Sequence, residues 1–202
     1  PVVICIIMML KDSRPGYIKL LPAILATLAL VFSLVSNFWC QSVKFSPRSN
    51  RSPVATLHFG LFTHSEYSTI NFEFSNLHFS TTQECTPYSM DIDDDMWKTA
   101  RAFAIIVSII GPIFSMLLWF VPCYSEFFRG IVWNVMSIVF IAILPFFQAM
   151  TFLLLSSQIC VDNPIMDLLG IIRLYDDGCK LDTGSYFNIV GIVLWFITGV
   201  VM

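Results

Sequence analysis

Four long runs of apolar residues limit what this chain can fold into. They cover residues 18–39, 99–121, 131–156 and 185–202. A helix needs about 20 predominantly apolar residues to cross the hydrocarbon core of a bilayer. The sequence therefore predicts an all-α transmembrane four-helix bundle, and we expect its short fourth helix to continue past Met202.

The low charge content supports this prediction. Hydrophobic residues make up 56% of the chain and charged residues only 12%, with a mean hydropathy of +0.76. A soluble domain carries about 25% charged residues. So few charges cannot cover a water-facing surface, and lipid must be the main solvent. The net charge of −3, without a basic run, argues against nucleic acid as a partner.

Four further segments flank or connect the spans: residues 1–17, 40–98, 122–130 and 157–184. The first begins with an apolar run too short to cross a bilayer, so we expect an interfacial helix, the end of a signal segment or the tail of a longer chain. Four spans put both long loops on one side of the membrane. Because long loops count little in the positive-inside rule, we expect cytoplasmic termini. The plasma membrane or secretory pathway is favoured, with a plastid membrane as the alternative.

The first long loop carries a strand pattern. Between residues 69 and 75, Ile70, Phe72 and Phe74 alternate with polar residues. Such alternation is typical of a strand with one buried face. We predict a small antiparallel β-sheet in the first extramembrane loop, with these three residues and Phe62 forming its apolar, partner-binding face.

Four cysteines fall in the two long loops: Cys40, Cys85, Cys160 and Cys179. An even number of loop cysteines indicates an oxidising compartment and two disulfides. Three pairings are possible, and we favour Cys40–Cys85 and Cys160–Cys179, since each closes its own loop. Reduced or metal-bound thiols are the alternative, but no Cys-x-x-Cys or Cys–His spacing supports a metal.

An acidic cluster closes the first loop: Asp91, Asp93, Asp94 and Asp95. Carboxylates on a short segment can gather Ca²⁺, which makes the cluster a weak metal candidate. It lacks the glycine and terminal glutamate of an EF-hand loop. We favour a solvated acidic patch, or a charge bias ahead of the second helix.

The remaining polar residues give weaker signals. His58, His64 and His78 have no ligand spacing, so we interpret them as surface or packing histidines. Asn50 lies in a glycosylation sequon, although Pro53 follows it.

Two amides, Asn134 and Gln148, lie within the third span. We favour hydrogen bonds from both to neighbouring helices or backbone. A ligand or ion path is the alternative, but no charged group lies mid-span to support it.

Nothing in the chain has the pattern of an enzyme. We find no nucleophile–base pair, phosphate loop or buried acid pair. The leading hypothesis is a non-catalytic structural or accessory membrane protein that binds another membrane protein, or itself, through its first loop and helix faces. The alternatives are a homo-oligomeric channel or pore and an auxiliary subunit of a pigment–protein complex. We predict no cofactor, and the lipid environment leaves room for bound lipid, sterol or pigment.

The layout resembles the claudin and peripheral-myelin-protein superfamily, in which four spans hold a long β-rich first loop and a shorter second loop. Gly60-Leu61-Phe62 resembles the start of the claudin loop signature, with Phe62 where that signature has Trp. Cys85 follows it, and its expected partner Cys40 precedes it. The resemblance implies a claudin-like bundle with a sheet in the first loop.

The chain also resembles a large family of uncharacterised four-span membrane proteins of diatoms and related algae. The likeness covers most of the chain and implies the same architecture without an activity. Its matching segments are Phe59–Phe62, Cys85–Tyr88, Asp95–Phe103, Cys179–Gly184 and Leu194–Phe196.

Overall fold

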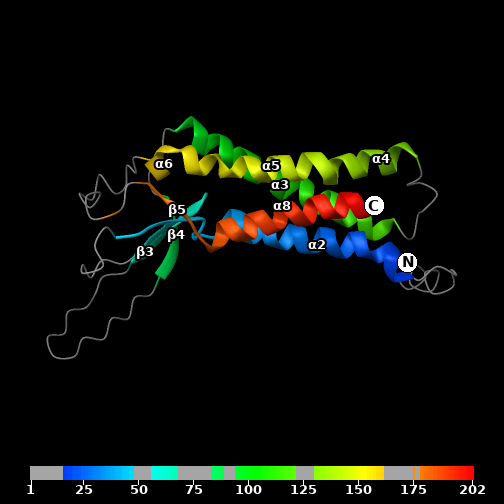
Figure 1. Ribbon diagram of the computed structural model, residues 1–202, viewed down its shortest axis with the longest axis horizontal. Helices are drawn as coiled ribbons and strands as arrows, with labels where there is room; N and C mark the ends of the chain where they lie inside the picture. The colour runs from blue at the N-terminus through cyan, green and yellow to red at the C-terminus, as the bar shows by residue number, and fades with distance from the viewer. Residues whose placement is uncertain are drawn as a thin grey trace, which may run out of the picture. The chain divides into compact units, whose positions relative to one another are not determined.

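The computed structural model describes residues 16–47, 56–67, 83–88, 94–121, 130–161, 175 and 178–202. Within those ranges, four helical stretches are long and apolar enough to cross a membrane, so the chain is a multi-pass membrane protein. Three of them are α2 (Gly16–Phe38), α3 (Asp95–Phe120) and α8 (Thr183–Val201) (Figure 1). Each of these begins two to four residues before the predicted span.

The third span is continuous but not uniform. It covers the predicted residues in four pieces: α4 (Ile131–Ile138), the π-helical η1 (Val139–Ile143), α5 (Leu144–Met150) and the 3₁₀-helical η2 (Thr151–Ser156). Pro145 explains the π turn, because a proline ring clashes with the carbonyl four residues earlier in an α-helix. The wider π turn just before it removes that clash.

The described residues fall into two compact units. The described part of the helical unit is residues 16–35, 102–121, 130–152 and 187–202. The described part of the sheet unit is residues 36–47, 56–67, 83–88, 94–101, 153–161, 175 and 178–186.

Trp195 is the centre of the helical unit and is fully buried. Its indole N–H donates to the Ser33 hydroxyl at 2.9 Å, and its ring lies 5.6 Å from that of Phe140. A methyl group added at Gly111 would lie 3.4 Å from the same indole. Residues of α2, α3, η1 and α8 therefore meet around one side chain.

Small residues let the helices of this unit approach closely. Ala23, Ala26 and Ala29 form a buried stripe on α2. A Cβ at Gly191 would lie 2.9 Å from the Ser33 hydroxyl, and a Cβ at Gly199 would lie 2.7 Å from the backbone nitrogen of residue 141. Small residues are the usual means of close helix packing in membranes. These two glycines therefore set how near α8 lies to α2 and to η1.

Within the described residues, the sheet has five antiparallel strands in the order β4-β3-β2-β1-β5. The strands are β1 (Val43–Phe45), β2 (Leu57–Phe59), β3 (Thr63–Tyr67), β4 (Gln83–Pro87) and β5 (Lys180–Leu181) (Figure 1). An antiparallel sheet is therefore confirmed. Its restriction to the first loop is wrong, because β5 belongs to the second loop and pairs with β1. The alternating run 69–75 lies outside the described residues.

Two disulfides brace the sheet unit, with the predicted pairing. Cys40 is bonded to Cys85, with their Cα atoms 5.7 Å apart, and Cys160 is bonded to Cys179, with their Cα atoms 4.9 Å apart. The first bond ties the segment after α2 to the edge strand β4. The second ties the short helix α6 (Gln158–Val161) to the segment before β5.

Candidate functional site

The turn between β2 and β3 positions the first part of the candidate site. Gly60 donates its backbone N–H to the carbonyl of Thr63 at 2.7 Å. A Cβ at Gly60 would lie 2.8 Å from the Cα atom of Cys40, too close for any side chain. The Gly-Leu-Phe segment is thus fixed by backbone packing, and it carries Phe62 at the turn.

Phe62 belongs to a cluster of three aromatic rings and one cation, which we call the arginine cluster: Phe38, Phe62, Trp97 and Arg101. The rings of Phe38 and Phe62 stack with centroids 5.3 Å apart. The guanidinium carbon of Arg101 lies 4.8 Å from the Phe62 centroid and 4.4 Å from that of Trp97. Phe38 is 52% exposed, whereas Trp97 is buried. The cluster therefore has a packed side and an open side.

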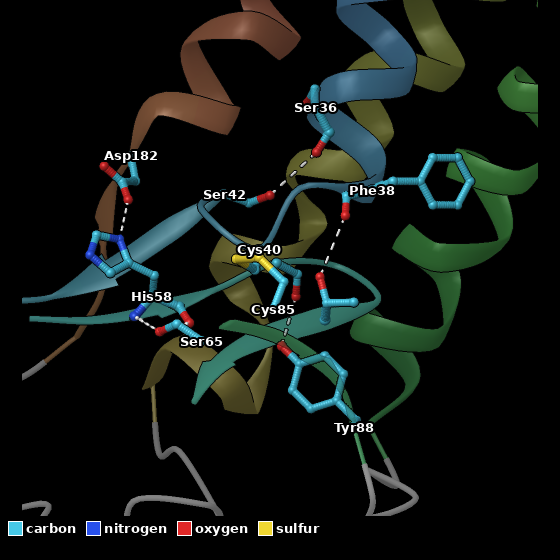
Figure 2. The surroundings of a disulfide bond; sticks show 11 residues. Ser36, Phe38, Cys40, Ser42, His58, Ser65, Cys85, Tyr88 and Asp182 are labelled. Atoms are coloured by element: carbon cyan, nitrogen blue, oxygen red, sulfur yellow. Dashed lines mark hydrogen bonds and ion pairs between the residues drawn. A yellow bond between two sulfur atoms is a disulfide. The ribbon is translucent and has the colours of Figure 1, made fainter. Parts of the chain in front are cut away.

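Tyr88 packs behind the arginine cluster. Its hydroxyl donates to the carbonyl of Gly60 at 2.7 Å (Figure 2). Its ring meets that of Trp97 edge-on, with the ring centroids 5.4 Å apart. Burial raises the pKa of Tyr88 well above its ordinary value, and the nearby Arg101 charge opposes that rise. The phenol is thus held neutral as a hydrogen-bond donor to the turn.

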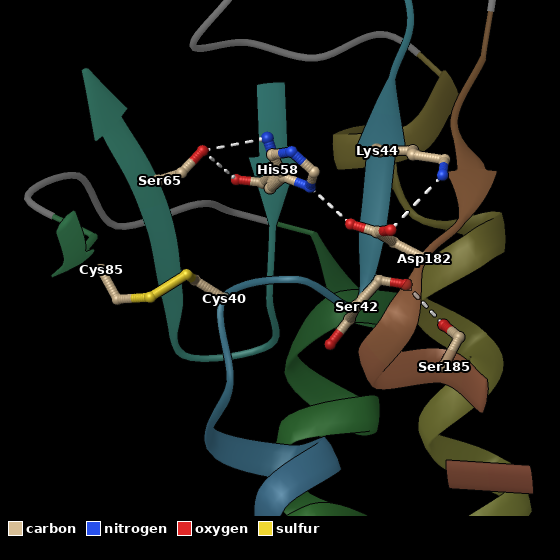
Figure 3. Close-up of polar contacts among 8 residues, drawn as sticks. All are labelled: Cys40, Ser42, Lys44, His58, Ser65, Cys85, Asp182 and Ser185. Carbon is tan, nitrogen blue, oxygen red and sulfur yellow. Dashed lines mark hydrogen bonds and ion pairs between the residues drawn. A yellow bond between two sulfur atoms is a disulfide. The ribbon is translucent and has the colours of Figure 1, made fainter. Parts of the chain in front are cut away.

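Asp182 joins the two loops on the other side of the sheet unit. One carboxylate oxygen pairs with the Nδ1 atom of His58 and the other with Lys44 Nζ at 3.4 Å (Figure 3). Its backbone N–H donates to the carbonyl of Ser42 at 3.1 Å. The buried carboxylate therefore holds β1 and β2 against the residues that open α8.

Asp94 performs a similar role for two helix ends. Its carboxylate accepts the Met96 N–H of α3 at 2.9 Å and the Gln158 N–H of α6 at 2.6 Å. Such N-cap bonds satisfy backbone donors that a helix leaves unpaired. This contact fits the predicted charge bias ahead of the second helix. It also explains why α3 begins at Asp95, ahead of the predicted start.

The weak calcium prediction gains no support from these contacts. In the part of the chain that the structure describes, no three His, Cys, Asp or Glu side chains are grouped to hold a metal. Asp94 is occupied by the two helix ends, and Asp95 is exposed. Asp91 and Asp93 lie outside the described residues.

Some of the other predicted site residues are described by the structure, and others lie outside the described ranges. Phe62 lies in the arginine cluster, while His58 and His64 pack within the sheet unit, the latter 5.0 Å from the Tyr88 ring. Several predicted residues lie outside the described ranges: Asn50, Ile70, Phe72, Phe74 and His78.

The structure separates the two amides of the third span. Gln148 is fully buried and donates to Asn188 of α8, whose amide in turn donates to the Thr151 hydroxyl at 2.7 Å. The predicted bond to a neighbouring helix is thus confirmed for Gln148. Asn134 is exposed, so the two amides do not line a common surface.

Sequence reasoning missed Arg101 and Asp182 as site residues. Arg101 follows Trp97 by one helical turn, and this Trp-x-x-x-Arg spacing puts both on one helix face. That spacing could have identified the cation–ring contact. Nothing in the sequence links Asp182 to His58, which lies 124 residues earlier.

No protein-family model and no curated protein matches the chain. The fold and the site therefore define its class: a multi-pass membrane protein with a disulfide-linked antiparallel sheet.

Proposed function

We propose that this protein is a non-catalytic structural or accessory membrane protein whose sheet unit binds another membrane protein or a second copy of itself. The pairing of β1 with β5 carries the proposal, because it joins both long loops in one sheet. One disulfide within each loop braces that sheet. A surface that is rigid before binding loses little conformational entropy when a partner docks.

We also propose a claudin-like class for the fold. Four membrane-length helices and a sheet built mainly from the first loop fit that layout, and the Gly60-Leu61-Phe62 turn lies within the sheet. Two disulfides fit an oxidising compartment. We therefore propose that the sheet unit faces the lumen or the exterior, that the termini are cytoplasmic, and that the protein belongs to the plasma membrane or secretory pathway.

The observations favour this function over a channel. A pore needs polar groups directed at a water path. The side-chain amide of Gln148 instead donates a hydrogen bond to Asn188 inside the helical unit. Asn134 is exposed and separate from that pair.

The test is the native mass of the tagged protein after extraction in a mild detergent. We expect a complex heavier than one chain, containing either a stoichiometric partner or further copies. A Cys40→Ser/Cys85→Ser variant, which frees the first loop, should lose the complex. The Cys160→Ser/Cys179→Ser variant, which frees the segment that leads into β5, should weaken the complex as well. Ser108→Ala is the control that should keep it, because that hydroxyl donates to the Ala104 carbonyl within its own helix. A strictly monomeric wild type with no stoichiometric partner would contradict the proposal.

A further inference from the structure

Arg101 is the seventh residue of α3, near the N-terminal end of the second candidate membrane span. Helix α3 has 26 residues and is thus about 39 Å long, against about 30 Å for the hydrocarbon core. The helix is therefore about 9 Å longer than the core, which is enough for its first turns, with Trp97 and Arg101, to lie in the headgroup region. Since side chains on a helix tilt toward its N-terminus, the guanidinium of Arg101 lies level with Trp97, one turn earlier.

The aromatic residues beside Arg101 mark the same level. Phe38 and Trp39, at the end of the first span, are 52% and 38% exposed. Exposed aromatic rings at span ends are typical of the interface between lipid and water. Phe38 stacks on Phe62, and Phe62 contacts Arg101, so the open side of the arginine cluster faces this zone.

The cation–ring contacts do not themselves occupy the N–H donors of Arg101. A guanidinium stacks through its planar face, while its five N–H donors lie in the plane and point outward. Among the described carboxylates, Asp94 accepts two backbone N–H groups and Asp182 pairs with Lys44 and His58. No described carboxylate pairs with Arg101, and its side chain is partly exposed.

We propose that the arginine cluster binds the phosphate of an anionic phospholipid headgroup. Arg101 provides the planar donor fork, which matches two phosphate oxygens. Phe62 and Trp97 hold that fork in place, and Phe38 covers the start of the acyl chains. Phosphate is the acceptor that the headgroup region supplies, which is why a lipid is the ligand we infer. This inference does not rest on the protein partner proposed above, although Phe62 belongs both to the arginine cluster and to the predicted partner-binding face.

The test is native mass spectrometry of the full chain, released from detergent micelles with phosphatidylglycerol. We expect one phosphatidylglycerol to be retained by the wild type. Arg101→Gln should lower its retention about tenfold, because it removes a charged hydrogen-bond donor. Lys180→Gln, which removes the same charge from an exposed strand residue, should leave retention unchanged. Equal retention by Arg101→Gln and the wild type would overturn the proposal.

Two further arms identify the chemistry that is bound. Diacylglycerol, which lacks phosphate, should not be retained, and inorganic phosphate should not displace phosphatidylglycerol. Retention of diacylglycerol, or displacement by inorganic phosphate, would overturn the lipid-phosphate assignment. If Arg101→Gln fails to fold, Arg101→Lys decides the question. Lysine keeps the charge but loses the fork, so weaker retention is expected and unchanged retention would refute the role of the fork.

Discussion

The contact between Ser33, Gly191 and Trp195 predicts a strong coupling between two conservative substitutions. The Ser33 hydroxyl accepts the Trp195 indole N–H at 2.9 Å, in the centre of the helical unit. A Cβ on Gly191 would also lie 2.9 Å from that hydroxyl oxygen. Gly191→Ala therefore displaces the Ser33 hydroxyl and breaks its hydrogen bond with Trp195. Ser33→Ala removes that hydrogen bond and also the oxygen atom with which the new methyl group would clash.

The magnitudes follow from these distances. Ser33→Ala leaves one buried N–H unpaired and should lower the free energy of unfolding by about 1–2 kcal/mol. Gly191→Ala should cost about 2–3 kcal/mol, since overpacking adds to the broken bond. In the double variant the next contacts of the new methyl lie at 3.4 and 3.7 Å, so only the cost of Ser33→Ala remains. The sum of the single effects should thus exceed the double effect by the cost of Gly191→Ala, about 2–3 kcal/mol.

The assay is equilibrium unfolding in mixed micelles of a mild detergent and dodecyl sulfate, followed by the helical circular dichroism signal. Ser108→Ala is the matched control, because that hydroxyl donates only to the Ala104 carbonyl in its own helix. It should change the free energy of unfolding by less than about 0.5 kcal/mol. Additive effects of Ser33→Ala and Gly191→Ala, within about 0.5 kcal/mol, would refute this account of the packing.

Three further substitutions test other contacts. Gly199→Ala should cost about 3 kcal/mol of unfolding free energy in the same assay, which is more than Gly191→Ala. The reason is that a Cβ at Gly199 lies 2.7 Å from the backbone of η1, which cannot move aside. A cost equal to or smaller than that of Gly191→Ala would contradict this close approach. Asp94→Ala should lower the thermal midpoint of unfolding by several degrees, because it removes capping hydrogen bonds that contribute about 2 kcal/mol. Asp95→Ala changes an exposed neighbour and should leave the midpoint unchanged. Tyr88 binds its proton more tightly in the folded state than in the unfolded state, so the free energy of unfolding should fall as pH rises above about 10. Tyr88→Phe should reduce that fall, and an unchanged pH profile would count against the buried phenol.

The helices and disulfides could be predicted from the sequence because each depends on a local signal. A membrane span is a property of about 20 consecutive residues, and the third span was found at its observed bounds, 131–156. The disulfides followed from two cysteines in each loop. The starts of the other spans were less accurate, because hydropathy marks the apolar core of a helix and misses its capped polar first turn.

The composition of the sheet and of the site could not be predicted in the same way. Strand β5 has two residues, too few for any periodicity, and its pairing with β1 is set by the fold. The Asp182 carboxylate meets His58 only because that pairing brings the two loops together. In the arginine cluster, Phe38 and Phe62 come from segments whose proximity depends on the Gly60 turn.

The pairing of β1 with β5 has a consequence for biogenesis. The first loop holds four of the five strands and both cysteines of its own disulfide, so the ribosome delivers nearly all of the sheet before the second and third spans are made. The side of β1 that pairs with β5 then stays unpaired until residues 180–181 are made. Unpaired strand edges readily join other chains. During its synthesis the protein therefore exposes a nascent edge that an insertion chaperone can shield, and premature termination after the third span would leave that edge open for the life of the fragment.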